Sequence, residues 1–304
     1  MEWEPRWFRK GFELKVQTRY CRVPVFVLLL FSPLLSISCA NAQSALPDSP
    51  SFSRGLATPV EGTEALGFPA PTPQTTQSRS DSDYSVKGLL KRGLRDQKEI
   101  YTLPLHRRNL KWTALFLAGT AGLIVADKHI SSEIGTEHTN VSNTISDVGL
   151  YSMIGSVGIL GLSGWRTGDS HERETAILGA EAFANSGIVL IGTQLIAGRQ
   201  RPLEGNHEGD FWKNNALDSS FPSGHSTFTW TLASVVAHEY PSPWVQFLTY
   251  GTATTVSITR VTALKHFPAD AAVGAVFGYF IGQHIFHSHC KLGLSPSCHR
   301  SRDQ

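Results

Sequence analysis

At residues 221–226 the chain reads Phe221-Pro222-Ser223-Gly224-His225-Ser226, directly before an apolar run, Thr227 to Ala237, that has the length of a helix. The first N–H groups of a helix have no partner inside it, and together with the helix dipole they favour negative charge. A hydroxyl, a glycine and an imidazole accompany these groups here. The stretch therefore predicts a helix start that can bind an anion such as phosphate.

Six apolar segments joined by polar loops lie between Leu110 and the C-terminal tail, and they include this run. They cover residues 110–126, 148–163, 176–197, 226–238, 245–262 and 271–286. None shows the sustained alternation of a strand, and their lengths favour helices. In the last segment Gly274, Gly278 and Gly282 form a repeated Gly-x-x-x-Gly, which allows two helix backbones to approach closely. We therefore predict an all-α fold with a six-helix bundle core.

The N-terminal part of the chain is typical of an exported protein. Basic residues within 1–22 precede an apolar run, Val23 to Ile37, and an Ala-x-Ala site at Ala40-Asn41-Ala42. This order predicts an export signal over residues 1–42 with cleavage after Ala42. Because the basic region is long, an uncleaved membrane anchor is the alternative. Either reading directs the chain to the cell envelope.

The rest of the chain divides by composition. Residues 43–85 are rich in Ser, Pro and Thr with few large apolar residues, which predicts a disordered linker. Residues 86–109 form a basic lead-in segment in which Pro104 would end a short helix. The bundle domain is expected over residues 110–287, followed by a C-terminal tail over 288–304.

The sequence leaves open whether the bundle spans a membrane. Several apolar segments are shorter than the roughly 20 residues that a span needs. The third carries Glu181, Asn185 and Gln194, and Glu181 would either pair with an arginine of the site or lie at the bundle edge. With residue 43 outside, three spans would also return the loop at 199–225 to the cytoplasm. These points favour an exported domain, periplasmic or membrane-associated, over an integral membrane protein.

Composition excludes some classes of partner. The 304-residue chain has a net charge of +2 and no long basic run with interleaved aromatics, so nucleic acid is not expected as a partner. Cys290 and Cys298 would form a disulfide in an exported chain or remain free thiols. No Cys-x-x-Cys pair or carboxylate cluster indicates a metal site. His287, His289 and His299 lack a recognised ligand spacing and are more consistent with a solvated tail.

Three polar clusters lie at the ends of the predicted helices. The first follows the third apolar segment and reads Arg199-Gln200-Arg201-Pro202. The second surrounds Ser223 at the helix start described above. The third contains Thr259-Arg260, then His266 and Asp270, between the last two helices. Because all three clusters lie at helix ends, we expect them to form one site.

The third cluster supplies a nucleophile. His266 stands just ahead of the last helix, and Asp270 can accept the imidazole N–H and leave the other nitrogen free to attack. Arg201 and Arg260 can grip phosphate oxygens in forked geometry. With His225 as an acid, these residues form the inventory for phosphoryl transfer without a metal or other cofactor.

These residues resemble the pattern of the type 2 phosphatidic acid phosphatase superfamily, which also contains bacterial acid phosphatases and vanadium haloperoxidases. The family pattern has three parts: Lys-x6-Arg-Pro, Pro-Ser-Gly-His and Ser-Arg-x5-His-x3-Asp. The second part is complete at residues 222–225. The third has Thr259 for Ser but keeps the spacing, and the first has Gln194 for Lys. The resemblance covers about residues 110–286 and none of 1–85, and it implies a six-helix core.

The resemblance implies a role for each matching residue. His266 would be the nucleophile that forms a phosphohistidine, Asp270 would orient it, and His225 would protonate the leaving group and then activate water. The phosphoryl oxygens would be bound by Arg201, Arg260, Ser223 and the Gly224 amide. Gln194 replaces a cationic contact, which weakens stabilisation of transition-state charge. We hypothesise that Arg199 compensates for this loss.

The resemblance implies a phosphatase that acts on phosphomonoesters in the cell envelope. The apolar helices and the lack of a broad basic patch favour a lipid phosphate, such as phosphatidic acid, an isoprenyl pyrophosphate or lipid A. Two alternatives stay open. The same cradle could hold vanadate on His266 in a haloperoxidase, or the lost lysine could mark a catalytically weakened phosphate-binding protein. The motif handles only the phosphoryl group, so it does not select among these lipids.

Overall fold

The computed structural model describes residues 86–290 apart from 216–217, together with Ser295 and Cys298. The predicted export signal and linker lie outside these residues. The described helices are α2 (Val86–Thr102), α3 (Leu110–Ser132), α4 (Thr139–Thr167), α5 (Ser170–Ala197), α6 (Gly224–Glu239), α7 (Pro243–Thr262) and α8 (Pro268–His289), with a short 3₁₀ helix η2 (Leu103–Leu105). No β-strand occurs in this part of the chain, so the predicted all-α fold is confirmed.

Each of the six predicted segments is a helix, and each helix is longer than its predicted segment. The largest difference is in α4, which begins at Thr139 rather than at residue 148. Residues 139–147, its first turns, are mostly polar and include Asn143 and Asp147, so a search for apolar runs passes over them. These turns pack against the end of α7, where Thr262 donates a hydrogen bond to Ser142 at 2.8 Å. Tertiary contacts therefore extend the helix beyond its apolar part.

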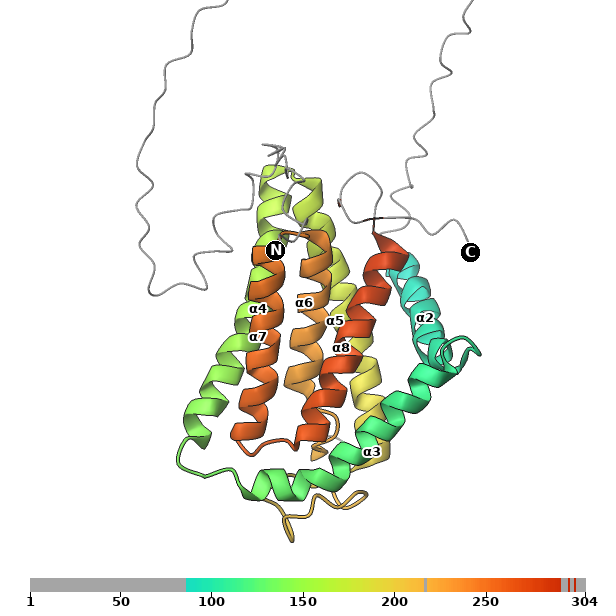
Figure 1. Cartoon of the computed structure of the whole chain (residues 1–304). Coiled ribbons are helices and arrows are strands. Elements are labelled where there is room, and N and C mark those ends of the chain that lie inside the picture. The colour runs from blue at the N-terminus through green and yellow to red at the C-terminus, as the bar shows by residue number, and fades with distance from the viewer. Residues whose placement is uncertain (1–85, 216–217, 291–294, 296–297, 299–304) are drawn as a thin grey trace, which may run out of the picture. The chain divides into compact units, whose positions relative to one another are not determined.

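Helices α6 and α8 are the most closely packed pair, and the glycine repeat explains why. Gly274, Gly278 and Gly282 face α6 at intervals of one turn. A Cβ on any of the three would overlap with a backbone oxygen of α6 or its cap, those of Ser223, Thr227 and Thr231 respectively. The predicted close approach of two backbones is confirmed. It sets the start of α6 beside the start of α8 (Figure 1).

The short helix expected in the lead-in segment is α2, and it packs on α5 and α8 through polar contacts. Arg92 pairs with Glu181 at 2.8 Å, so Glu181 contacts an arginine of α2 rather than one of the site. Asp96 lies 2.9 Å from His289, and both side chains are buried. The reading of His289 as part of a solvated tail is therefore wrong, because Asp96 draws its imidazole into the bundle.

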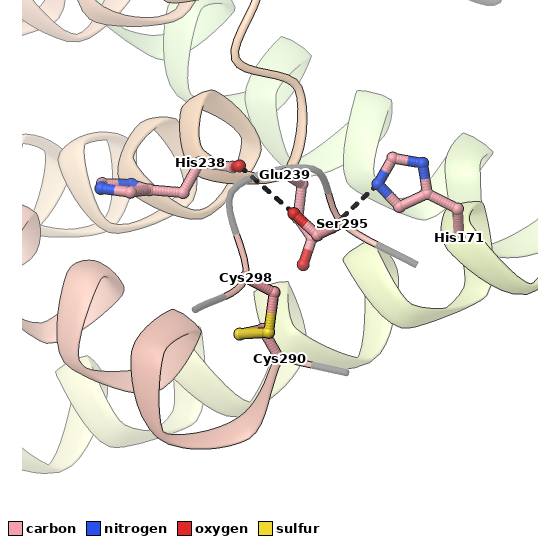
Figure 2. Close-up of a disulfide and its surroundings, with 6 residues drawn as sticks. All are labelled: His171, His238, Glu239, Cys290, Ser295 and Cys298. Atoms are coloured by element: carbon pink, nitrogen blue, oxygen red, sulfur yellow. Dashed lines mark hydrogen bonds and ion pairs between the residues drawn. A yellow bond between two sulfur atoms is a disulfide. The ribbon is translucent and has the colours of Figure 1, made fainter. Parts of the chain in front are cut away.

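The tail is closed by a disulfide between Cys290 and Cys298, which decides between the two states that the sequence left open. Ser295, inside this loop, donates a hydrogen bond to the His238 carbonyl at 3.5 Å. Figure 2 shows the disulfide beside the ends of α6 and α8, near the ion pair of His171 with Glu239. Closing a loop of this size lowers the entropy of the unfolded chain, which stabilises the fold by about 2–3 kcal/mol at room temperature.

Three helices are long and apolar enough to cross a membrane by length and composition: α3 with 23 residues, α4 with 29 and α5 with 28. For the segments at 110–126 and 148–163 this corrects the expectation that several apolar segments are too short to span, since the helices that contain them are longer than the segments. The three helices suggest that the protein associates with a membrane.

Candidate active site

All of the predicted site residues lie at one end of the bundle. In Figure 1 this is the end where α5 finishes, α6 and α8 begin, and α7 finishes. The Ser223 amide donates to the Asp270 carbonyl at 3.0 Å, which joins the cap of α6 to the first turn of α8. The three polar clusters of the sequence therefore meet, although 71 residues separate Arg199 in the first from Asp270 in the third.

The loop between α5 and α6 folds back on itself and supports the site. Gly198 ends α5 in the left-handed conformation, with φ of 48°, which a residue with a side chain rarely adopts. The end of the loop then bonds to its beginning. The Ser220 amide donates to the Arg199 carbonyl at 2.8 Å, and the Ser220 hydroxyl donates to the Gln200 carbonyl at 2.9 Å. These bonds hold the Ser220 backbone beside the end of α5.

His266 is buried, and its orientation is set by this loop. Its Nδ1 lies 2.7 Å from the Ser220 carbonyl oxygen. A carbonyl can only accept, so Nδ1 carries the proton and the lone pair is on Nε2. The Asp270 Oδ2 atom is 3.9 Å from Nδ1, beyond hydrogen-bond distance. The expected hydrogen bond from His266 to Asp270 is therefore not formed, and the Ser220 carbonyl holds the tautomer in its place.

Asp270 is engaged elsewhere. One oxygen accepts from the Phe267 amide at 2.8 Å, which caps α8, and the other lies 2.6 Å from Arg199 Nη1. Burial raises the pKa of Asp270 to about 7, against the lowering effect of the Arg199 charge. Asp270 therefore caps the start of α8 and pairs with Arg199 rather than with the His266 imidazole.

Arg199 is enclosed by protein groups, with 1% of its surface exposed. Besides Asp270, it contacts Asp127 of α3 at 2.8 Å and donates from Nε to the Gly209 carbonyl at 3.0 Å. Its guanidinium also lies over the ring of Phe267, 4.3 Å from the centroid. The hypothesis that Arg199 compensates for the missing lysine is therefore wrong, because two carboxylates hold its guanidinium inside the fold.

Gln194 lies on the last turns of α5 and faces the loop. Its side-chain amide is 3.3 Å from the Pro222 carbonyl and 3.5 Å from the Ser219 carbonyl. The residue at the position of the family lysine thus contacts the backbone just ahead of Ser223. Its amide donors are directed at carbonyl oxygens in this arrangement.

Arg260 and Ser223 present polar atoms for which the described residues offer no partner. Arg260 donates from Nη1 to Asn143 Oδ1 at 2.9 Å and to Ser146 Oγ at 3.2 Å, while its Nε is buried without a hydrogen bond. The Ser223 hydroxyl is also buried and unpaired among these residues. Such groups are costly unless a ligand or water meets them. Arg201 is more open, with 27% of its side chain exposed.

Electrostatic effects connect the two arginines with both histidines. Burial lowers the pKa of His266 well below 6.5, and the charges of Arg260 and Arg201 lower it further. Burial likewise lowers the pKa of His225, as do Arg260 and Arg201, against the raising effect of Asp147. The charges of both arginines thus act on both imidazoles. Both imidazoles release protons more readily than they would in water.

Asp147 is a residue of this site that the sequence analysis did not identify. Its Oδ1 lies 2.8 Å from His225 Nε2 and 3.6 Å from Arg260 Nη1. The sequence feature that could have indicated it is the polar pair Asn143 and Asp147, four residues apart and just before the apolar segment at 148–163. That spacing places both side chains on one helix face, but nothing local shows what the face meets.

Comparison with known proteins gives one finding. Residues 175–293 match a protein-family model described as PAP2 superfamily. No curated protein and no solved structure matches the chain. The matched residues run from α5 to the tail, so they include His225, Arg260 and His266, whereas Asp127 and Asp147 lie on helices outside the match.

Proposed function

We propose, from the premise that residues 175–293 form a PAP2 superfamily domain, that this protein hydrolyses phosphomonoesters of lipids through a phosphohistidine on His266. Superfamily membership suggests phosphatase activity and a phosphoester substrate. The observation that carries the proposal is the state of His266. Its imidazole is tied through Nδ1 to the Ser220 carbonyl, and its pKa is lowered by burial first and then by nearby positive charge, so that the Nε2 lone pair is available.

The reaction has two steps. His266 Nε2 attacks phosphorus, the ester P–O bond breaks, and His225 gives its proton to the departing alkoxide. His225, now neutral, then removes a proton from water, which attacks phosphorus and breaks the P–N bond. Inorganic phosphate leaves and both histidines return to their initial states. Each step needs one proton transfer, which a single imidazole near its pKa can supply.

The charge on the phosphoryl group would be met by groups that already converge. Arg260 and Arg201 supply positive charge, and the unpaired Arg260 Nε and Ser223 hydroxyl are suited to phosphoryl oxygens. Gly224 is the first residue of α6, so its amide is one of the unpaired N–H groups at a helix start that favour an anion. Because these donors stand in place before substrate arrives, little reorganisation accompanies the reaction.

A lipid substrate is supported by the outward face of the bundle. Exposed large apolar side chains follow one another along α4: Val141, Ile145, Val148, Tyr151, Ile154, Ile159, Leu162 and Trp165. α5 adds a second series near the site end: Ile188, Ile191, Leu195 and Ile196. Exposed apolar side chains in this number along two helices favour contact with a membrane or another apolar partner. A site beside such a surface meets its substrate in the bilayer.

The proposal is tested by a substrate panel. We expect kcat/KM to be higher for phosphatidic acid or an isoprenyl phosphate in mixed micelles than for glycerol phosphate, because the apolar chains add binding energy beside the site. Phosphate release is measured for each substrate with the same detergent present. Equal kcat/KM for lipid and soluble esters contradicts the lipid assignment. Vanadate-dependent bromide oxidation without any phosphate release contradicts the phosphatase itself.

The pH dependence follows from the two histidines. His266 must be neutral, so activity rises as pH passes its pKa, which lies well below 6.5. His225 must be protonated for the first step, so activity falls as pH passes its pKa, which is also lowered from 6.5. We expect the profile of kcat/KM against pH to be a bell with its maximum on the acid side of pH 6.5. A maximum above pH 7.5 contradicts this assignment of roles.

A further inference from the structure

Helix α4 brings a polar face to the site, although it lies outside the residues matched by the family model. Ser142 accepts a hydrogen bond from Thr262 at 2.8 Å, at the end of α7. Asn143 and Ser146 both accept from Arg260, at 2.9 and 3.2 Å. Asp147, one turn after Asn143, reaches the imidazole of His225 at 2.8 Å. The start of α4 therefore forms a wall of the site.

We infer that Asp147 is the positioning residue of the general acid: it holds the Nε2–H of His225 and favours the protonated imidazole, which leaves Nδ1 to exchange the proton with the leaving group. This inference rests on the proposed function, in which His225 is the acid. The contact distance is that of a charge-assisted hydrogen bond. A carboxylate on one ring nitrogen fixes which of the two carries out proton transfer.

The charges around His225 show why such a residue is needed. Arg260 of α7 and Arg201 of the loop after α5 both disfavour a proton on His225, as does burial of the ring. His266, on the link from α7 to α8, is close enough for His225 to affect its pKa. Asp147 of α4 is the carboxylate that opposes these effects. The arginines that suit phosphate binding would otherwise leave the general acid without its proton.

Asp147 is itself held in place. Asn143 donates from its amide to Asp147 Oδ2 at 2.9 Å and accepts from Arg260 at 2.9 Å. Asp147 and His225 keep 37% and 25% of their side-chain surface exposed, so a leaving group can approach the pair. Asp147 also lies 3.6 Å from Arg260 and offsets part of the charge that would bind the substrate.

The first measurement does not need activity. The pKa of His225 is followed by NMR of protein labelled at histidine, with its signal assigned from His225→Gln. In Asp147→Asn, which keeps an acceptor but loses the charge, we expect this pKa to fall by about 1 unit. Asp147→Glu should keep it near the wild-type value. Ser142→Ala, which removes a hydroxyl from the same helix face, is the matched control and should leave it unchanged.

The second measurement uses leaving groups. A weakened general acid affects an alkyl phosphate, whose alkoxide must be protonated, more than p-nitrophenyl phosphate, whose phenolate leaves unaided. In Asp147→Asn we expect kcat for the alkyl ester to fall about 10-fold more than kcat for the aryl ester. KM should stay equal or fall, because the Asp147 charge no longer offsets the charge with which Arg260 would bind the phosphate. The alkaline limb of the alkyl-ester profile should move to lower pH.

The outcomes separate this inference from the proposed function. An unchanged His225 pKa in Asp147→Asn overturns the inference, whatever the activity. Equal losses with the two leaving groups overturn it as well, because a merely structural defect affects both esters alike. If the wild type hydrolyses neither ester but the His225 pKa shifts as expected, the contact is upheld while the phosphatase assignment fails.

Discussion

His266→Ala is expected to lower kcat for phosphoester hydrolysis at least about 10³-fold, or about 4 kcal/mol in activation free energy. The variant loses the atom that forms the covalent bond to phosphorus, and the described residues around the site offer no second neutral imidazole in the same environment. KM should change much less, since Arg201, Arg260 and Ser223 remain to bind the phosphoryl group. Steady-state kinetics on the best substrate of the panel measures both quantities.

The covalent intermediate gives a readout that a structural role would not produce. With substrate labelled at phosphorus, the wild type should retain label after rapid denaturation in alkali and lose it in acid, as expected for a P–N bond. His266→Ala should retain none. His129→Ala, an exposed histidine on the last turn of α3, is the control and should match the wild type. Undiminished phosphate release from His266→Ala would sink the proposed mechanism.

Arg199→Met is expected to destabilise the fold by about 3–5 kcal/mol. The substitution leaves two buried carboxylates, Asp127 and Asp270, without the cation that neutralises both. It also removes the hydrogen bond to the Gly209 carbonyl and the stacking on Phe267. Because burial already raises the pKa of Asp270 to about 7 against the Arg199 charge, losing that charge favours its protonation and disturbs the cap of α8.

The free energy of unfolding measures this effect in denaturant titrations of protein purified in mild detergent. Arg166→Met, an exposed arginine in the last turn of α4, is the matched control and should change stability by less than about 0.5 kcal/mol. The double variant Asp127→Asn/Arg199→Met should lose less than the sum of the single losses, since both substitutions remove the same ion pair. Additive losses would contradict the pairing, and a folded Arg199→Met of wild-type stability would contradict its structural role.

The sequence alone predicted the helices of this protein and the close packing of two of them. The repeat of Gly274, Gly278 and Gly282 predicted the close approach of two helices, because a missing Cβ acts on the packing wherever the helix lies. The apolar runs located six helices, since burial selects apolar residues along a helix. The pairing of Cys290 with Cys298 was left open and needed the structure.

The contacts of the site were harder to predict. Asp270 at four residues from His266 seemed placed to orient it, but the carbonyl of Ser220 does so. Backbone carbonyls carry no signal in a sequence, because every residue has one. From the sequence, Arg199 was expected to replace the charge of the missing lysine, yet it forms a buried ion pair with Asp127 of α3. The ion pair of Arg199 with Asp127 forms only because α3 packs against the end of the bundle that holds the site.

The same distinction holds for the residues of the catalytic proposal. The order of Ser223, Gly224 and His225 at a helix start determined a place where an anion is favoured, because helix ends have free N–H groups whatever surrounds them. The tertiary structure alone decided that Asp147, 78 residues earlier, meets His225. Pairing of charges depends on which helix faces which, and this is set by packing over the whole bundle rather than by any neighbouring residue.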